Sequence, residues 1–415
     1  MTTGLAAGLG LAASCAVIAR IPDLVQTPGL FLVVFALAFF CYAAGSWCLT
    51  AERGWRPLFI VLAVAIVARL LLLPAAPTLS TDVYRYVWDA RVAHARIDPY
   101  LYTPEAKELE PLRDQDVFPR LNHPTWRTIY PPGAQAFFQA VYRLRPDSVL
   151  AMKAALGLGE LVGLAVVGGL VWASGQPLSR VVIYAWNPLV LVETWGMGHL
   201  EALVVPAVAG ATWAALRRRY AAAGALLAAG TLVKLYPAAL LLLLPVAGWR
   251  AAVPSFLALV LIGYAPAALA GTPVTGSLGR YMTEEYFNPG LVRSVVNLPA
   301  LTVLAAVLWV ALVSVTYRHL ALSSRAVTLI GGLLLLSPNI FPWYVVWLVP
   351  FLAVAPSLPW IAFTGSVVFA YAFFLRQPWA VPWWARALEF TPLALGAFWW
   401  LVMRLPALRW QERST

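Results

Sequence analysis

Long uninterrupted stretches of apolar residues recur along the whole chain. The stretches at 29–50, 57–77 and 148–172 each reach the roughly 20 residues that an α-helix needs to cross a bilayer. Of the 415 residues, 61% are hydrophobic and only 11% are charged. Soluble globular domains use about one quarter charged residues. The pattern therefore excludes a soluble globular protein and predicts an all-α polytopic membrane protein.

The remaining apolar stretches predict further helices, about 12–14 transmembrane or half-spanning ones in all, within a single integral membrane domain over 1–415. They lie at 4–20, 180–195, 199–216, 221–236, 237–249, 252–270, 295–316, 326–337, 343–355, 358–375 and 390–405. Four of them are short and form two pairs, which break at Leu235-Tyr236-Pro237 and Ser337-Pro338-Asn339. Non-helical backbone at membrane depth survives only where protein buries it or where it lines a polar cavity. Both breaks are therefore predicted walls of a site.

Basic residues outnumber acidic ones, with 29 Lys and Arg against 18 Asp and Glu. The short basic loops, such as Arg53 with Arg56 and Arg217–Arg219, fall mainly on one side of the predicted bundle. Because such loops stay in the cytoplasm, we expect a multi-pass inner (plasma) membrane protein with both termini cytoplasmic. Membrane orientation accounts for the basic excess, so we expect membrane lipids and no nucleic acid as partners.

Two polar segments then lie outside, a large external loop at 78–147 and a second external loop at 271–294. The large loop holds nine of the 18 acidic residues. Its densest cluster runs from Thr81 to Arg91, and in a helix Asp82, Arg85 and Asp89 share one face. A solvated helix carrying an Arg85–Asp89 pair is the simple interpretation. Sugar and phosphate binding at the membrane surface is the functional one.

A second cluster, at 122–135, contains Tyr130 followed by the paired prolines Pro131 and Pro132. Proline is tolerated in the first helical turn, so the pair predicts a rigid start to a helix. Tyr130 and Gln135 are also candidates to face a site.

Further candidates lie in or beside the spans. His199 and Glu201 are two residues apart, so a metal pair would need a bent backbone, and we predict no metal site.

Lys234 beside a broken helix is explained either by snorkelling to the headgroups or by holding a lipid phosphate. Trp343 and Tyr344 fit an interfacial aromatic belt or a re-entrant wall. Arg280 and Arg293 in the second external loop fit an amphipathic helix on the membrane.

Several of these motifs occur together in one known class of enzymes. The chain carries Asp82-Val83-Tyr84-Arg85-Tyr86-Val87-Trp88-Asp89, Asp98-Pro99-Tyr100, Ile129-Tyr130-Pro131-Pro132, Lys234-Leu235-Tyr236-Pro237 and Pro342-Trp343-Tyr344. In this order they resemble the GT-C class of membrane glycosyltransferases, specifically glycosyltransferase family 87, whose members depend on polyprenyl-phosphate mannose.

The resemblance implies a GT-C-like bundle that moves a hexose, mannose by preference, from a polyprenyl-phosphate donor to a hydroxyl of a lipid or glycan acceptor. It implies inversion at the anomeric carbon, an active site on the external face and no cofactor. Asp82 matches the family's catalytic aspartate and is the expected general base. The expected substrate-binding residues are Arg85, Asp89, Tyr130, His199, Glu201, Lys234, Arg280, Arg293, Trp343 and Tyr344.

A membrane transporter or flippase of a lipid-linked sugar is the alternative, because broken helices with ionisable residues also build transport sites. That function predicts a site at the bilayer midplane and an inverted repeat. The charges instead gather in the external segments, which favours the transferase.

Overall fold

The computed structural model describes residues 2–411, and they contain helices and connecting loops without a strand. Among the described residues, seven segments are long and apolar enough to cross a membrane. They are α1 (Thr2–Arg20), α2 (Pro28–Leu49), α3 (Trp55–Leu72), α6 (Val149–Ala173), α12 (Val246–Leu269), α15 (Pro299–Thr316) and the continuous pair α19 (Leu358–Ser366) with η7 (Val367–Leu375). The prediction of an all-α polytopic membrane protein is confirmed.

Further helices complete the bundle, and most of them are shorter than these spans. They are α7 (Val182–Ala185), α8 (Pro188–Val190), the π-helical η4 (Leu191–Gly196), α9 (Glu201–Leu216), α10 (Tyr220–Thr231), α11 (Pro237–Leu240), η5 (Leu241–Leu243), α16 (Leu322–Leu336), α17 (Pro342–Val345), η6 (Val346–Leu348), α18 (Val349–Leu352) and the terminal α20 (Trp383–Gln411). The expected helix at 180–195 is in fact broken, because Pro188 cannot continue a helix and Asn187 caps the next turn through Leu189 N–H.

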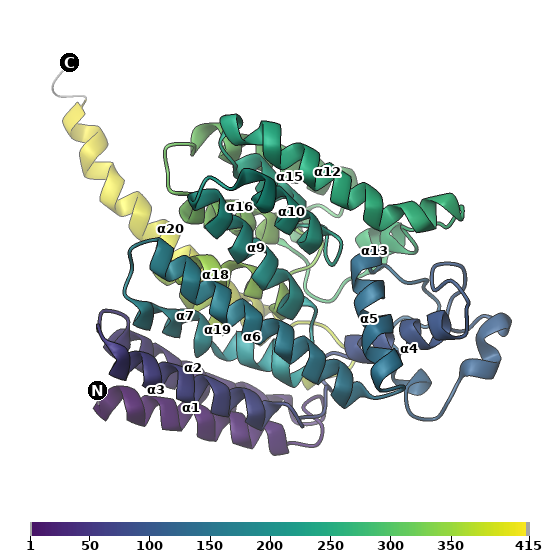
Figure 1. Ribbon diagram of the computed structural model, residues 1–415. Helices are drawn as coiled ribbons and strands as arrows, with labels where there is room; N and C mark the ends of the chain where they lie inside the picture. Colours follow the sequence, from purple (N-terminus) through teal and green to yellow (C-terminus); the bar gives the residue numbers. More distant parts are fainter. Residues whose placement is uncertain (1, 412–415) are drawn as a thin grey trace.

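The two segments predicted to be external, 78–147 and 271–294, are called the external loops. They form α4 (Asp82–His94), α5 (Pro132–Leu144), α13 (Leu278–Glu284) and α14 (Leu291–Val295), with 3-10 turns η1 (Lys107–Leu112) and η2 (Phe118–Arg120). Pro132 occupies the first turn of α5, as the paired prolines predict. The helices α4, α5 and α13 lie together at one end of the bundle, and α1 begins at the other end (Figure 1).

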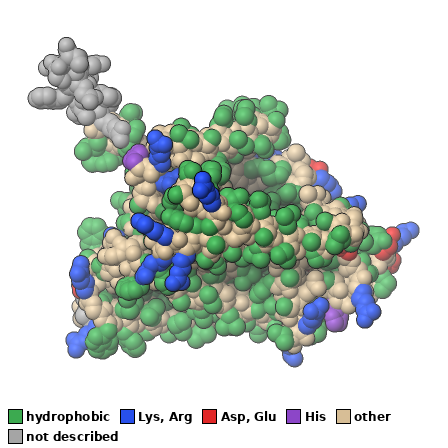
Figure 2. Space-filling model, turned by 45° about the horizontal axis from the view of Figure 1, so that its top comes forward, with side chains coloured by type: hydrophobic (Ala, Val, Ile, Leu, Met, Phe, Trp, Pro, Cys, Tyr) green, Lys and Arg blue, Asp and Glu red, His purple; other side chains and the backbone are tan. Residues whose placement is uncertain are grey.

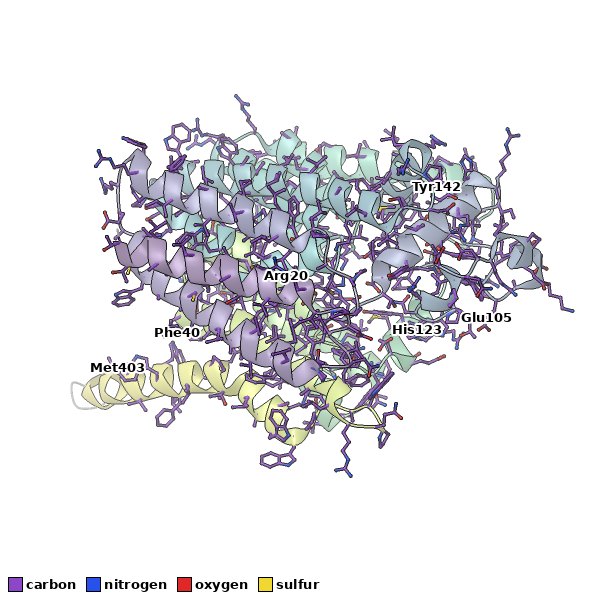
Figure 3. All side chains as sticks on the ribbon, turned by 90° about the horizontal axis from the view of Figure 1, so that it is seen from below. Arg20, Phe40, Glu105, His123, Tyr142 and Met403 are labelled. Carbon is purple, nitrogen blue, oxygen red and sulfur yellow. The ribbon has the colours of Figure 1, made fainter. Side chains whose placement is uncertain are left out.

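The surface follows the same division. Hydrophobic side chains cover the middle of the face in Figure 2, while Lys and Arg gather towards its ends and the visible acidic side chains lie mainly at one end. Figure 3 places Met403 on α20 at one end and His123 and Glu105 at the other. The last described part of the chain therefore lies opposite the large polar segment.

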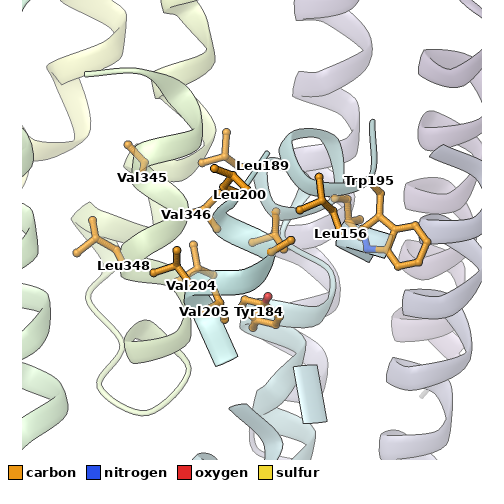
Figure 4. Close-up of a cluster of buried hydrophobic side chains, with 14 of the residues drawn as sticks. Leu156, Tyr184, Leu189, Trp195, Leu200, Val204, Val205, Val345, Val346 and Leu348 are labelled. Carbon is orange, nitrogen blue, oxygen red and sulfur yellow. The ribbon is translucent and has the colours of Figure 1, made fainter. Parts of the chain in front are cut away.

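The core is built where the broken helices cross the long ones. Leu189, Leu200, Val345 and Val346 are buried there, and their side chains pack together (Figure 4). Beside this cluster, Arg69 on α3 and Glu160 on α6 form a fully buried ion pair, with Nη2 and Oε1 2.6 Å apart. The pair satisfies both charges inside the bundle, where an unpaired charge is costly.

Candidate active site

A cavity of about 770 Å³ opens at the junction of the bundle and the external helices. It is lined by the start of α4, the segment 122–131, both helix breaks and the second external loop. The lining residues with polar or aromatic side chains include Asp82, Arg85, Asn122, His123, Trp126, Arg127, Tyr130, Lys234, Tyr236, Tyr281, Glu285, Phe287, Ser337, Asn339, Phe341, Trp343, Tyr344, Trp347, Phe373, Phe374 and Trp379. Both predicted breaks are thus walls of the cavity.

Asp82 stands at the first position of α4, where the free N–H groups of a helix favour a carboxylate. Nδ2 of Asn122 donates a hydrogen bond of 2.6 Å to its Oδ1 atom. Within residues 2–411 no hydrogen bond reaches Oδ2, so this oxygen is available to a ligand in the cavity. The carboxylate is therefore oriented through one oxygen and free at the other, the arrangement that proton transfer needs.

Arg85 and Asp89 form the pair that the helical spacing predicts. Arg85 Nε lies 2.8 Å from Asp89 Oδ1, and Gln135 Nε2 donates to the other carboxylate oxygen at 2.9 Å. Arg85 Nη2 also donates to the Trp126 carbonyl at 3.0 Å. Asp89 is buried outside the cavity lining, so its contacts orient Arg85 and tie α4 to α5.

Tyr130 links the two external helices to the cavity. Its ring packs edge-on against Tyr86 with the centroids 5.1 Å apart, and its carbonyl accepts a hydrogen bond from the Tyr100 hydroxyl. Burial, followed by the nearby Asp82 carboxylate, holds the pKa of Tyr130 well above its usual range. Tyr130 is therefore a protonated hydroxyl in the wall beside Asp82.

Lys234 lines the cavity but already has a partner. Its Nζ lies 2.5 Å from Glu201 Oε1, and Nε1 of Trp347 donates to the same oxygen at 3.0 Å. The ammonium also lies 4.8 Å from the centroid of the Tyr344 ring. Glu201 is completely buried, so its contact with Lys234 offsets an otherwise unpaired charge.

The aromatic wall comes mostly from the second helix break. Trp343 and Tyr344 both line the cavity, and the Tyr344 hydroxyl contacts that of Tyr281 from the second external loop. Phe287 stacks on Phe341 with the centroids 5.2 Å apart. These rings give the cavity an extended apolar surface beside the polar groups around Asp82.

His199 lies behind this wall. Its ring stacks on Trp343 at 4.1 Å between centroids, and its Nδ1 atom lies 3.1 Å from Glu193 Oε2. The Tyr371 hydroxyl donates to the other Glu193 oxygen at 2.9 Å. His199 is fully buried and is not a lining residue, so it supports Trp343 from outside the cavity.

The two arginines of the second external loop also lie outside the cavity lining. Arg280 pairs with Glu284 on the surface of α13 and lies over the Trp126 ring. Arg293 is buried, and its guanidinium donates to the carbonyls of Thr283 and Glu285 at 2.6 and 2.7 Å. These contacts of Arg293 stabilise the conformation of the second external loop.

Sequence reasoning did not single out four polar or aromatic lining residues of the segment 122–131, which are Asn122, His123, Trp126 and Arg127. Asn122 was not separated from its neighbours, because nothing in the spacing shows that it reaches Asp82. Arg127 lines the cavity, and its guanidinium makes no hydrogen bond or ion pair with any residue that the structure describes. Arg85 and Lys234, the other lining cations of the described chain, are both paired with carboxylates. Arg127 is thus the cation available to an anionic ligand.

Metal chemistry has no ready ligand set here. Across residues 2–411 no three His, Cys, Asp or Glu side chains come together as a metal site would require. Asp82 and Glu285 are the carboxylates in the lining, and Asn122 and His123 already contact them.

Comparison with known proteins assigns the chain to an enzyme family. The sequence model described as alpha-(1->6)-mannopyranosyltransferase, N-terminal domain, matches residues 3–253. The match includes Asp82, Tyr130 and Lys234 and ends before the second external loop. No curated protein and no solved structure matches the chain. Because the matched part is more than half of the chain, the protein belongs to the alpha-(1->6)-mannopyranosyltransferase family of membrane glycosyltransferases.

Proposed function

We propose that the protein transfers mannose from a polyprenyl-phosphate donor to a hydroxyl of a lipid or glycan acceptor, with Asp82 as the general base. The observation that carries this proposal is the Asp82 carboxylate, held by Asn122 in a cavity of a mannosyltransferase-family chain. The finer assignment to glycosyltransferase family 87 remains part of the proposal.

The reaction is a single displacement. The acceptor hydroxyl attacks the anomeric carbon, its proton passes to Oδ2 of Asp82, and the bond from that carbon to the phosphate oxygen breaks. Polyprenyl phosphate leaves with the bonding electrons from the opposite face, so the configuration inverts. General base catalysis of this kind typically contributes about 10²- to 10⁴-fold.

The donor would enter from the bilayer. A polyprenyl chain gains about 0.8 kcal/mol for each CH₂ that it buries, which keeps the donor in the membrane. The aromatic wall around Phe287 and Phe374 would hold the first isoprene units, and Trp343 and Tyr344 would stack on the sugar or the chain. Arg127 would hold the leaving phosphate, because a guanidinium binds phosphate oxygens in a fork. Lys234 would add a second positive charge while remaining paired with Glu201.

The location follows from the charge pattern. We place the cavity on the external face of the inner membrane, with both termini in the cytoplasm. The large polar segment and the described end of α20 lie at opposite ends of the bundle, in agreement with this topology (Figure 3).

The test uses purified protein in lipid, radiolabelled polyprenyl-phosphate mannose and a membrane extract as acceptor source. Asp82→Asn should abolish transfer and leave folding intact. Asp116→Asn, on an exposed carboxylate of the same loop, is the matched control and should keep full activity. Transfer near the wild-type rate by Asp82→Asn would exclude this base. Movement of the donor across a vesicle membrane without a glycosidic product would favour transport.

A further inference from the structure

The two external loops meet at His123. Its Nε2 atom lies 2.8 Å from Oε2 of Glu285, and its ring stacks on Trp126 with the centroids 4.1 Å apart. The Glu285 side chain is only 12% exposed and the His123 side chain 43% exposed, so the contact is shielded from water on the carboxylate side. A carboxylate of the second loop therefore holds a residue of the first.

The residue before His123 contacts the proposed base. Asn122 donates to Asp82 Oδ1 at 2.6 Å. The His123 backbone has φ of 45°, in the left-handed region that few residues other than glycine adopt. A backbone in this region persists only where its surroundings hold it, and the contact with Glu285 is such a restraint. Two consecutive residues thus connect Asp82 to the second loop.

Glu285 is itself held by the rest of the protein. Its carbonyl accepts hydrogen bonds from Arg293 Nη1 at 2.7 Å and from Asn339 Nδ2 at 2.8 Å. Asn339 belongs to the second helix break, so Glu285 is anchored to the membrane bundle. The chain of contacts therefore runs from the bundle through Glu285, His123 and Asn122 to Asp82.

We propose that Glu285 and His123 are positioning residues for Asp82. Their contact fixes the turn at 122–126, and the fixed turn presents Asn122 to Oδ1 so that Oδ2 faces the acceptor hydroxyl. The inference rests on the proposed role of Asp82 as the base. A displacement of about 1 Å in a reacting group can cost about 10²-fold in rate, so a loosened turn should slow transfer.

Other charged groups surround the same turn and contribute differently. Arg280 lies with its guanidinium carbon 5.2 Å from the centroid of the Trp126 ring, but its charge is opposed by Glu284. Arg85 donates to the Trp126 carbonyl at 3.0 Å. Arg280 Nη1 also donates to the Thr125 carbonyl at 3.4 Å, so both arginines hold the far end of the turn, whereas His123 is adjacent to Asn122 in the chain.

The kinetic test compares Glu285→Ala, Asn122→Ala and the double variant. Each single change should lower kcat about 10- to 100-fold with little change in the KM for donor. The double variant should be no slower than Asn122→Ala, because both changes remove the same orientation of Asp82. Effects that multiply would overturn the proposal, since Glu285 would then act independently of Asn122.

Two matched variants separate positioning from a general loss of structure. Glu285→Gln keeps a hydrogen-bond acceptor for His123 and should restore most of the activity that Glu285→Ala loses. Glu284→Gln changes the adjacent exposed carboxylate, which contacts Arg280, and should behave like the wild type. Equal losses in Glu285→Gln and Glu285→Ala would overturn the proposal.

Amide hydrogen exchange tests the contact without any substrate. Glu285→Ala should speed exchange in residues 122–127, and Glu284→Gln should not. Unchanged exchange in Glu285→Ala would overturn the proposal whatever the activity. If the two variants show the expected exchange but the wild-type protein transfers no mannose, the proposed reaction fails and the contact between the loops stands.

Discussion

Lys234 and Glu201 form an ion pair at the wall of the cavity, with Nζ and Oε1 2.5 Å apart. Sequence alone left Lys234 either snorkelling to the headgroups or holding a lipid phosphate. The pairing changes what a substitution there should do, because the carboxylate is completely buried and the ammonium only 16% exposed. The main role of Lys234 in the folded protein is then to neutralise Glu201.

Lys234→Met should destabilise the protein by about 3–5 kcal/mol, because it leaves a buried carboxylate without its partner. The double variant Lys234→Met with Glu201→Gln should recover much of that loss. Thermal unfolding in one detergent measures both. If Lys234→Met instead left the unfolding temperature unchanged and raised only the KM for donor, Lys234 would be a phosphate ligand free of Glu201.

Arg127→Ala should lower kcat/KM for donor by about 10- to 100-fold, since a hydrogen bond to a charged group contributes about 1.5–3 kcal/mol. Arg127→Lys should lose less, because it keeps the charge but not the fork. Arg145→Ala, which removes an exposed arginine at the far end of α5, is the matched control. Steady-state kinetics over a range of donor concentrations measures kcat/KM, and an unaltered kcat/KM in Arg127→Ala would contradict the assignment.

Gly276→Ala should separate the two external loops and reduce activity. Gly276 has φ of 48°, and a Cβ atom there would lie 1.7 Å from the Thr128 carbonyl oxygen. Backbone cannot move away from such an overlap as a flexible side chain can, so the loop must shift. Gly279→Ala is the control, because a Cβ atom there meets nothing within 4 Å. Equal activity of the two variants in the transfer assay would show that the loops are not tightly joined at Gly276.

The stability of the large external loop should depend on pH through Asp114. Partial burial acts to raise the pKa of Asp114, but hydrogen bonds from Arg91 and from the Phe118 and Val117 N–H groups outweigh it and lower the pKa to about 2. A carboxyl whose pKa falls on folding stabilises the folded state above its ordinary pKa of 3.8. That contribution should disappear as the pH falls from about 4 towards 2.

The measurement is the difference in loop stability between the wild type and Asp114→Asn, followed by hydrogen exchange from pH 7 downwards. The difference should be constant to about pH 5 and shrink below it. Asp116→Asn serves as the control, since Asp116 is exposed. A difference between wild type and Asp114→Asn that stayed constant down to pH 2 would refute the role of this carboxylate.

Local sequence predicted most of the long helices and two of their interruptions, but not the break at Pro188 or the continuous α12 across 246–269. The long apolar stretches predicted α2 and α6 within a few residues, because a chain in a bilayer must satisfy its backbone hydrogen bonds within helices. The prolines at 237 and 338 identified two of the cavity walls for the same reason. The i, i+4 spacing also predicted the Arg85–Asp89 pair, since residues four apart on a helix are neighbours.

Only the tertiary structure decided which residues far apart along the chain contact each other. Asn122 reaches Asp82, Lys234 meets Glu201, and Arg293 turns towards carbonyls of its own loop instead of the cavity. A sequence pattern records the type and local spacing of side chains, whereas these contacts depend on how the helices pack. Sequence therefore determined which residues were candidates, and packing decided which of them face the cavity and which are already paired.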